Sequence, residues 1–365
     1  MILDAYLARR FARALLIVGG AFSGLTVMIE MIEQLRRFAA ADLGIGTLFS
    51  LSLLRLPAAM YDLLPIVVAL ATLVMFLGLA RSSELVVTRA AGRSALRALV
   101  PPVVVAFVFG LLTVAVLNPL SAAASREYDQ REAEIAGGGT QAFSVSDEGL
   151  WLREGDGNGQ TVIRASRSNF DATTLRDVTF LGFETDGNLT YRIEADEARI
   201  GPENWELKGA KYWPLADTLN PEAEATLHET MTLPTQLSPD EIRNRFGKPK
   251  EISIWDLTAF IDKLEAAGFS ARAYKMWFQS ELALPLTFVA MVLIGAGLTM
   301  RHTRLGGTAP RVLIAILLAF LFFFLRNFAN ILGQNGEVPI SLAAWGAPLA
   351  VILAATALLL HLEDG

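Results

Sequence analysis

The sequence contains no cysteine among its 365 residues and only three histidines. The absence of cysteine excludes disulfide bonds, thiolate metal sites and cysteine nucleophiles. His228, His302 and His361 are widely separated along the chain, so we do not expect them to form a histidine-based metal cluster. The usual residues of a small metalloenzyme are therefore largely missing.

Recognisable catalytic motifs are also lacking. Gly247-Lys248 has no glycine five residues earlier and no following Ser or Thr, so it is not a phosphate-binding P-loop. The glycine-rich stretch from Gly155 to Gly159 precedes no helical pattern and is typical of a hairpin turn. No histidine lies near a serine in a hydrolase-like motif. We predict a non-catalytic chain that binds no cofactor directly, with any energy for transport supplied by a partner or an ion gradient.

Long apolar runs, in contrast, are abundant. Hydrophobic residues make up 53% of the chain and the mean hydropathy is +0.43, which is more apolar than an ordinary soluble protein. Each run is long enough to cross a hydrocarbon core of about 30 Å as a helix. The first ends in Glu30 and Glu33 without a cleavage site, so we interpret it as a retained helix. The six predicted transmembrane helices are Phe11–Ile32, Leu56–Ala80, Leu99–Leu120, Leu282–Thr299, Ala309–Leu332 and Ile340–Leu360.

The charged residues of the loops predict the orientation. The segment 121–275 holds 17 Lys and Arg against 27 Asp and Glu, whereas the remainder holds 14 against 10. By the positive-inside rule, the more basic set of short loops faces the cytoplasm. That set is Arg9, Arg10, Arg13, Arg81, Arg89, Arg93, Arg97, Arg301, Arg304 and Arg311, and the opposite set is Arg36, Arg37 and Arg55. Both termini are therefore expected in the cytoplasm, with the acidic segment on the other side of a bacterial inner membrane, in the periplasm.

The segment 121–275 has the pattern of an all-β domain. Short alternating or β-rich stretches are separated by turn clusters, which favours a sandwich, jelly roll or open barrel. The predicted strands include 150–152, 161–163, 178–181, 189–193 and 205–207. A helix is expected from Ser253 to Ala267, ended by Gly268. The fold class is thus a bundle of six transmembrane helices, in residues 1–120 and 276–365, with an inserted domain resembling a β-jellyroll.

A short polar segment from Arg81 to Gly92 separates the second and third runs. Its cap serine, acidic first turn, apolar side and final glycine predict a helix of about three turns. Such a helix is too short to span the membrane. Its spacing fits an interfacial helix lying on the bilayer and equally a coupling helix that docks on a cytoplasmic ATPase.

Charged residues also lie in or near the predicted outer leaflet. Glu30, Glu33 and Arg37 share one helical face, and Arg326 lies inside the fifth run. One interpretation is snorkelling with local ion pairs. The other is a cavity that accepts a phosphate-bearing amphiphile, whose head group would be held by basic residues. A small-xxx-small pattern from Gly20 to Gly24 is a further candidate helix contact.

These features carry a resemblance over essentially the whole chain. The sequence resembles the LptF/LptG (YjgP/YjgQ) family of lipopolysaccharide export permeases, and within it the LptG branch of alphaproteobacteria. The most specific matching segments are Glu33-Gln34-Leu35-Arg36-Arg37, Ser83-Glu84-Leu85-Val86-Val87, Arg89-Ala90-Ala91-Gly92, Leu117-Asn118-Pro119-Leu120, Phe260–Phe269 and His361-Leu362-Glu363-Asp364-Gly365.

The resemblance implies a partnership and a substrate. It implies a heterodimer with an LptF-like permease, seated on two copies of an LptB-like ATPase that uses ATP and Mg²⁺. The pair would extract lipopolysaccharide from the outer leaflet of the inner membrane and pass it to LptC-like and LptA-like periplasmic proteins. The partners would thus be proteins, lipid and membrane, without nucleic acid. Helices one and five would form lateral gates with the partner permease.

The resemblance also assigns residues to roles. The segment Arg81–Gly92 would be the coupling helix, with the contacting residues Arg81, Glu84, Leu85, Val86, Arg89 and Gly92. Lipid contacts would come from Glu33, Arg36, Arg37, Arg126 and Arg326. Glu30 and Asp129 stand where the family pattern leads us to expect basic residues, so the head-group contacts differ from that pattern.

Three alternatives remain open at this stage. The chain could be the LptF-like subunit of the same exporter. It could be a receptor that senses envelope stress, although every predicted cytoplasmic stretch is short. It could also be a secondary transporter with a three-plus-three repeat, although the sequence indicates no broken helix pair.

Overall fold

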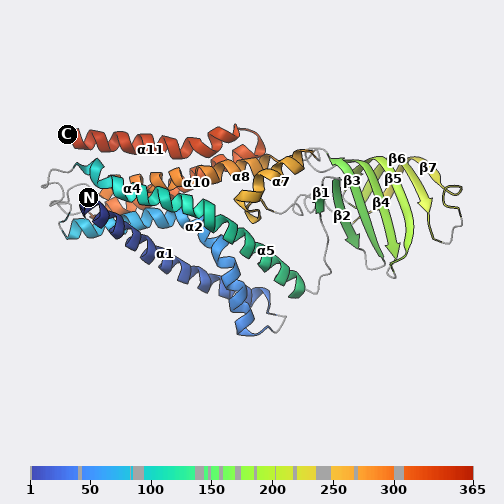
Figure 1. The fold of residues 1–365 in the computed structure, drawn as a ribbon, viewed down its shortest axis with the longest axis horizontal. Helices are drawn as coiled ribbons and strands as arrows, with labels where there is room; N and C mark the ends of the chain where they lie inside the picture. Colours follow the sequence, from blue (N-terminus) through green and yellow to red (C-terminus); the bar gives the residue numbers. More distant parts are fainter. Residues whose placement is uncertain are drawn as a thin grey trace. The chain divides into compact units, whose positions relative to one another are not determined.

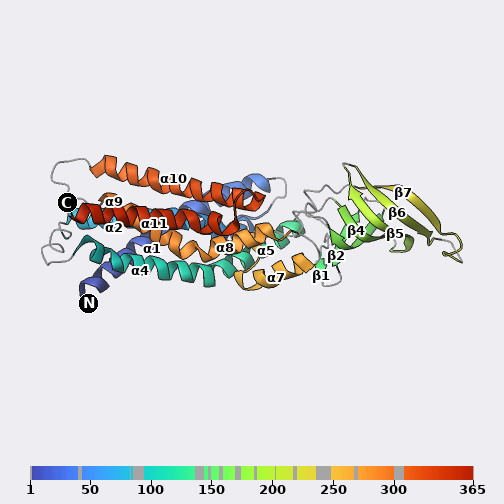
Figure 2. The ribbon, with the colours of Figure 1, turned by 90° about the horizontal axis from the view of Figure 1, so that it is seen from above.

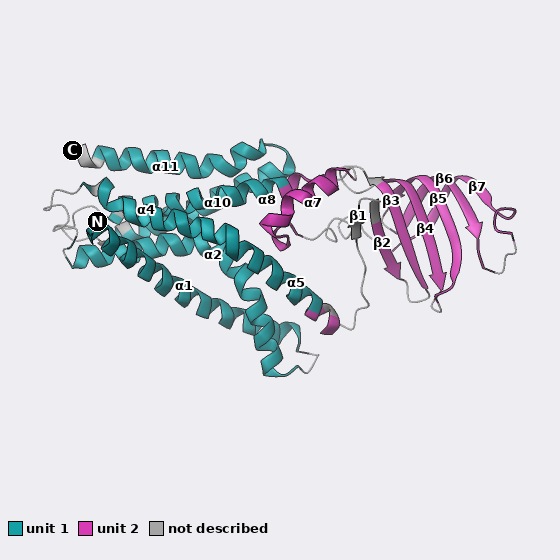
Figure 3. Ribbon diagram, viewed as in Figure 1, with its two compact units in different colours: residues 1–130, 275–365 teal, residues 131–274 magenta. Residues whose placement is uncertain are grey.

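The computed structural model describes the chain as two compact units (Figure 3). The described residues are 2–39, 43–82, 84, 94–135, 144–146, 149–155, 159–168, 174–184, 187–201, 203–216, 220–235, 248–266, 270–299 and 308–364. One unit consists of Met1–Gln130 with Lys275–Gly365, and the other is Arg131–Tyr274. The sequence led us to expect the inserted domain from Ser121; the compact unit begins ten residues later because a helix continues past that point.

The first unit is a bundle of long helices (Figures 1 and 2). Its elements are α1 (Ile2–Arg37), α2 (Ile45–Arg81), α4 (Ala95–Leu112), the π-helix η1 (Thr113–Leu117), α5 (Asn118–Ile135), α8 (Arg272–Leu282), α9 (Leu284–Thr299), α10 (Thr308–Asn335) and α11 (Ile340–Asp364). Within the described residues, five helices are long and apolar enough to cross a membrane, and a sixth span is complete if α8 and α9 count as one. The predicted membrane bundle with an inserted all-β domain is confirmed.

The helix α9 lies at the centre of this bundle. It packs against α2, α4, α10 and α11, and its residues Phe288, Ala290, Met291 and Val292 are fully buried. A helix that is apolar all round is expected to be surrounded by other helices, as α9 is. The helix α1 differs, since it packs on α2 and α4 and exposes one whole face, including Leu16, Ile17, Leu25, Met28 and Ile29.

The bend between α8 and α9 corrects the sequence analysis, which indicated no broken helix pair. The two helices meet at an angle of 50°. Pro285, in the first turn of α9, has no backbone N–H to donate and its ring crowds the preceding turn, so the helix breaks just before it. Gly110 of α4 permits a close approach there, because an added Cβ would lie 2.5 Å from the Cα atom of Pro285. The sequence analysis missed the break because the predicted span begins at Leu282, so the more polar α8 was not counted as part of it.

The second unit is built on one antiparallel sheet of seven strands. The strands pair in chain order, as β1 (Ser144–Ser146), β2 (Gly149–Gly155), β3 (Gly159–Ser168), β4 (Thr174–Glu184), β5 (Leu189–Ile200), β6 (Asn204–Pro214) and β7 (Thr226–Pro234). The described strands thus form a meander, and all five predicted strand segments lie within β2 to β6. The helix α7 (Ile254–Ala266) follows; the predicted stop at Gly268 falls outside the described residues.

The sheet is curled so that strands far apart in the pairing order meet. The hydroxyl of Thr235, just after β7, donates to both carboxylate oxygens of Glu154 in β2 at 3.0 Å. Four strands separate β2 from β7 in the sheet, so this contact requires strong curvature. The curl encloses an apolar inner face, formed by Leu152, Ile163, Ala165, Val178, Phe180, Ile193, Ala195, Trp205 and Leu207, all of which are buried.

Gly182 allows the curl at one end of this inner face. Tyr191, its partner on β5, lies across the glycine, and its hydroxyl is 3.0 Å from the hydroxyl of Thr161. An added Cβ at Gly182 would lie 2.1 Å from the Tyr191 ring. A side chain at this position must therefore displace the tyrosine.

We expect Gly182→Ala to destabilise the β unit by about 1–3 kcal/mol, the usual range for overpacking. Gly155→Ala is a matched control, because an added Cβ there meets only the Gly159 carbonyl oxygen, at an ordinary 3.5 Å. Hydrogen exchange of the full-length protein should show faster exchange in β4 and β5 for the Gly182 variant alone. Equal exchange in both variants would contradict this account of the glycine.

Candidate functional site

The carboxylate of Glu84 is bound by three side chains from two parts of the bundle. Nη1 of Arg10 donates to both of its oxygens, at 2.7 and 2.8 Å. The hydroxyls of Tyr6 and Ser82 donate to it at 2.6 and 2.7 Å. Tyr6 and Arg10 are one turn apart on α1, and Ser82 caps the end of α2. The glutamate therefore joins the segment after α2 to the start of α1.

These contacts determine the ionisation of Glu84. Partial burial opposes ionisation, but the hydrogen bonds from Tyr6, Ser82 and Arg10 outweigh it and hold the pKa of the Glu84 carboxyl below its ordinary value. A lowered pKa means that the charged form, and the contacts that depend on it, persist at neutral pH and are lost only as the pH falls through that lowered value. At neutral pH the carboxylate is thus a fixed negative charge.

The other predicted coupling residues are only partly described. Arg81 is exposed at the end of α2. Leu85, Val86, Arg89 and Gly92 lie outside the described residues, so the predicted helix Arg81–Gly92 stays a prediction.

The far end of α1 carries the predicted head-group residues. Arg36 is largely exposed and forms an ion pair with Glu33 at 3.1 Å. Nη1 of Arg37 donates to the hydroxyl of Tyr128 at 3.2 Å, and that hydroxyl donates to Gln34 at 3.1 Å. Tyr128 belongs to α5 and is 1% exposed, so Arg37 is anchored to a second helix while Arg36 reaches outward.

Arg55 of α2 completes this basic cluster. It pairs with Glu30 at 3.6 Å, and its guanidinium lies 4.8 Å from the centre of the Tyr128 ring. Arg126, also predicted, is exposed on α5, where its Nε donates to the carbonyl of Ala122 at 3.4 Å. Local ion pairs are thus present here and the Arg36 guanidinium is exposed, while the head-group role of these residues stays a prediction. Sequence reasoning missed Tyr128, whose only signal was an aromatic residue in a charged helical stretch.

A separate polar cavity lies within the helical unit, where the bent α8–α9 pair faces α2 and α10. Its volume is about 280 Å³, and its lining includes Tyr61, Asp62, Glu281 and Arg326. The Glu281 side chain is 1% exposed. Tyr61 donates a hydrogen bond to it, and Nδ2 of Asn118 donates to the same oxygen at 3.4 Å. Arg326 lines the same cavity as the carboxyl groups of Asp62 and Glu281.

The surrounding backbone is irregular at this cavity. Asn118 follows directly on the π-helix η1, and Glu281 precedes the α8–α9 bend by two residues. π-Helical turns inside longer helices occur frequently at functional sites. The sequence offered a signal for Asn118, a polar residue ending an apolar run, but nothing that paired it with Glu281.

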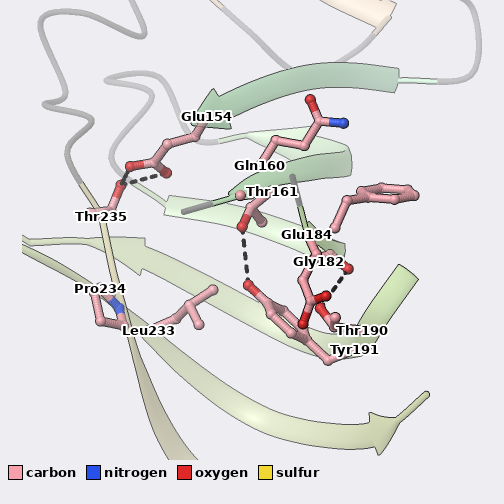
Figure 4. Close-up of a pocket in the computed structure, with 12 residues that line it drawn as sticks. Glu154, Gln160, Thr161, Gly182, Glu184, Thr190, Tyr191, Leu233, Pro234 and Thr235 are labelled. Carbon is pink, nitrogen blue, oxygen red and sulfur yellow. Dashed lines mark hydrogen bonds between the residues drawn. The ribbon is translucent and has the colours of Figure 1, made fainter. Parts of the chain in front are cut away.

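The β unit has its own pocket, at the polar end of the inner face (Figure 4). Its volume is about 420 Å³, and Glu154, Thr161, Gly182, Tyr191 and Thr235 are among the residues that line it. Leu233 and Pro234 also line it. Several of these polar groups pair with one another, and the pocket lies at one end of the inner face, whose apolar residues are buried. In the described part of the chain, no group of three His, Asp or Glu residues is arranged to hold a metal ion.

Comparison with known proteins points to one family along nearly the whole chain. The family described as "Lipopolysaccharide export system permease LptF/LptG" matches residues 5–361. The lipopolysaccharide export system permease protein LptG of Haemophilus influenzae is 24% identical over 360 residues, which cover 96% of this chain and 95% of that protein. The LptG of Escherichia coli K12 is 25% identical over 337 residues, covering 89% and 88%.

Proposed function

Because the chain belongs to the LptF/LptG family of lipopolysaccharide export permeases, we propose that it is the LptG-type subunit of an ATP-driven exporter. As a family member with several membrane-spanning helices, it is a multi-pass protein of the inner membrane and a component of the lipopolysaccharide export system. The relatives named above are LptG proteins, which favours this subunit over the LptF type and over an envelope-stress receptor.

In this proposal both termini and the segment Arg81–Gly92 face the cytoplasm, and the β unit faces the periplasm. The excess of arginine in one set of loops supports that orientation. Two LptB-like ATPases bind ATP and Mg²⁺, and they contact this chain through Arg81–Gly92. The observation that most supports the coupling role is the Glu84 contact set, since it ties the segment to a transmembrane helix rather than leaving it loose on the bilayer.

The partner permease is LptF-like and packs on the exposed face of α1. That face includes Gly20 and Gly24, where an added Cβ would meet nothing within 4 Å, so another helix can approach closely. The extracted lipid first binds in the membrane near the basic end of α1. It then passes to the apolar inner face of the β unit and onward to LptC-like and LptA-like proteins. Buried aliphatic residues on that face suit acyl chains.

Photo-crosslinking tests the proposed lipid path. A photoreactive residue at position 36 or 37 should capture lipopolysaccharide in intact membranes, because these guanidiniums combine exposure with positive charge suited to phosphate. Position 326 tests whether the internal cavity lies on the same path. A probe at the exposed Arg97, at the opposite end of the bundle in the proposed orientation, is the matched control. Capture at Arg97 but at none of the three test positions would contradict the proposed binding region.

A further inference from the structure

The contact between α1 and Glu84 reaches beyond the coupling segment itself. Two of the three side chains that bind Glu84, Tyr6 and Arg10, belong to α1, and Arg10 also donates to the Tyr6 hydroxyl. Gly78 of α2 leaves room for this guanidinium, since an added Cβ would lie 3.3 Å from Nη2 of Arg10. The arrangement is a latch, which we define as Tyr6, Arg10, Ser82 and Glu84.

The latch sits on a well-anchored part of α1. Leu7 and Phe11 flank Arg10 and are 2% and 0% exposed within the bundle core. Displacing Glu84 would therefore pull on a turn of helix that is fixed by burial rather than on a frayed end. Charge-assisted hydrogen bonds are shorter and roughly twice as strong as neutral ones, so this connection resists separation better than an apolar contact of the same size.

The rest of α1 can carry such a displacement. The helix runs unbroken for 36 residues and contains no proline, unlike α2, which contains Pro57 and Pro65. At 1.5 Å per residue it extends about 54 Å. At its other end, Arg37 and Gln34 are bound to the buried Tyr128 of α5. The same helix therefore connects Glu84 to the basic cluster formed by Arg36, Arg37 and Arg55.

We infer that Arg10 and Tyr6 are positioning residues that transmit movement of the ATPase-contacting segment, through Glu84, along α1 to the basic cluster at its far end. This inference rests on the proposed function. Under this inference, the ATPase moves α1 directly through the Glu84 contacts. It also moves α2, which is joined to the segment by the continuous chain. ATP hydrolysis by the partner then displaces the guanidinium groups of the basic cluster, while the ATPase stays bound to the segment that it contacts.

The experiment compares variants of the complete complex with its ATPase and partner permease in proteoliposomes. The measured quantity is lipid released per ATP hydrolysed. Arg10→Ala should lower this ratio by roughly threefold, the scale of a partly exposed ion pair, while hydrolysis continues. Arg10→Lys should recover part of it. Arg9→Ala, which removes the exposed neighbouring guanidinium, should leave the ratio unchanged.

The outcomes separate this inference from the function on which it rests. If the unaltered complex releases lipid with ATP, and Arg10→Ala gives the same ratio as Arg9→Ala, the transmission role is wrong and the proposed function stands. If the unaltered complex shows no ATP-dependent release, the proposed function itself fails. If the Arg10→Ala variant does not accumulate, Tyr6→Phe takes its place in the same comparison. Tyr6→Phe removes a single hydrogen-bond donor to Glu84, so a smaller drop in lipid released per ATP hydrolysed is expected.

Discussion

Arg326→Ala should destabilise the helical unit by about 1–3 kcal/mol, because it leaves the buried Glu281 carboxyl without the guanidinium that lines the same cavity. Glu281 is 1% exposed and shares its cavity with Asp62 and Arg326. Tyr61 and Asn118 donate hydrogen bonds to Glu281, but they supply no positive charge. Without the guanidinium, a buried carboxylate next to a second acid has lost the cation that offsets its charge.

Thermal unfolding of the purified protein in detergent measures this effect. The midpoint should fall by roughly 2–12 °C, given about 2–4 °C per kcal/mol for a unit of this size. Arg326→Met combined with Glu281→Gln should recover much of the loss, because replacing both charged partners removes the imbalance. Arg97→Ala, at an exposed position, is the control. A normal midpoint for Arg326→Ala would show that this arginine does not serve as the counter-ion of the cavity.

Glu84→Lys is expected to reduce ATP-driven lipid release more than tenfold. The substitution replaces the hydrogen bonds donated by three side chains with a cation placed against Arg10, so the segment should separate from α1. A loss of two to three such bonds exceeds the 1.4 kcal/mol that corresponds to a factor of ten. The chain should still insert and fold, because Glu84 lies outside the predicted membrane spans.

Release of lipopolysaccharide from proteoliposomes, with ATP hydrolysis recorded in parallel, tests this prediction. Glu84→Gln keeps the shape and removes the charge, so it should fall between the lysine variant and the unaltered chain. Unchanged release by Glu84→Lys would refute the coupling role of this segment.

Much of the fold could be predicted from the sequence, because hydrophobic runs and period-two alternation are properties of neighbouring residues. The predicted first span, Phe11–Ile32, lies inside α1, but the helix continues from Ile2 to Arg37. Hydropathy marks only the part that matches the hydrocarbon core, whereas the helix ends where the backbone changes direction. The bend before α9 was missed for a related reason, since hydropathy marks only α9 as a span and gives no sign that the more polar α8 extends it.

The sequence predicted individual residues of the site but not which residues contact one another. Intramembrane charge singled out Arg326, and the resemblance singled out Glu84. The contacts depend on packing between distant segments, because Tyr61 and Asn118 are 220 and 163 positions from Glu281. The same holds for Arg10 and Glu84, which are 74 positions apart. Neither hydropathy nor spacing encodes such pairings.

The central claim, that this chain couples ATP hydrolysis by a partner to export of lipopolysaccharide, is tested most directly by purification followed by reconstitution. The tagged chain should copurify with a second permease and an ATPase. The reconstituted complex should transfer lipopolysaccharide to a periplasmic acceptor protein only when ATP is hydrolysed. Transfer that continues at the same rate after ATP depletion, or a complex that contains a kinase or regulator and no ATPase, would contradict the account.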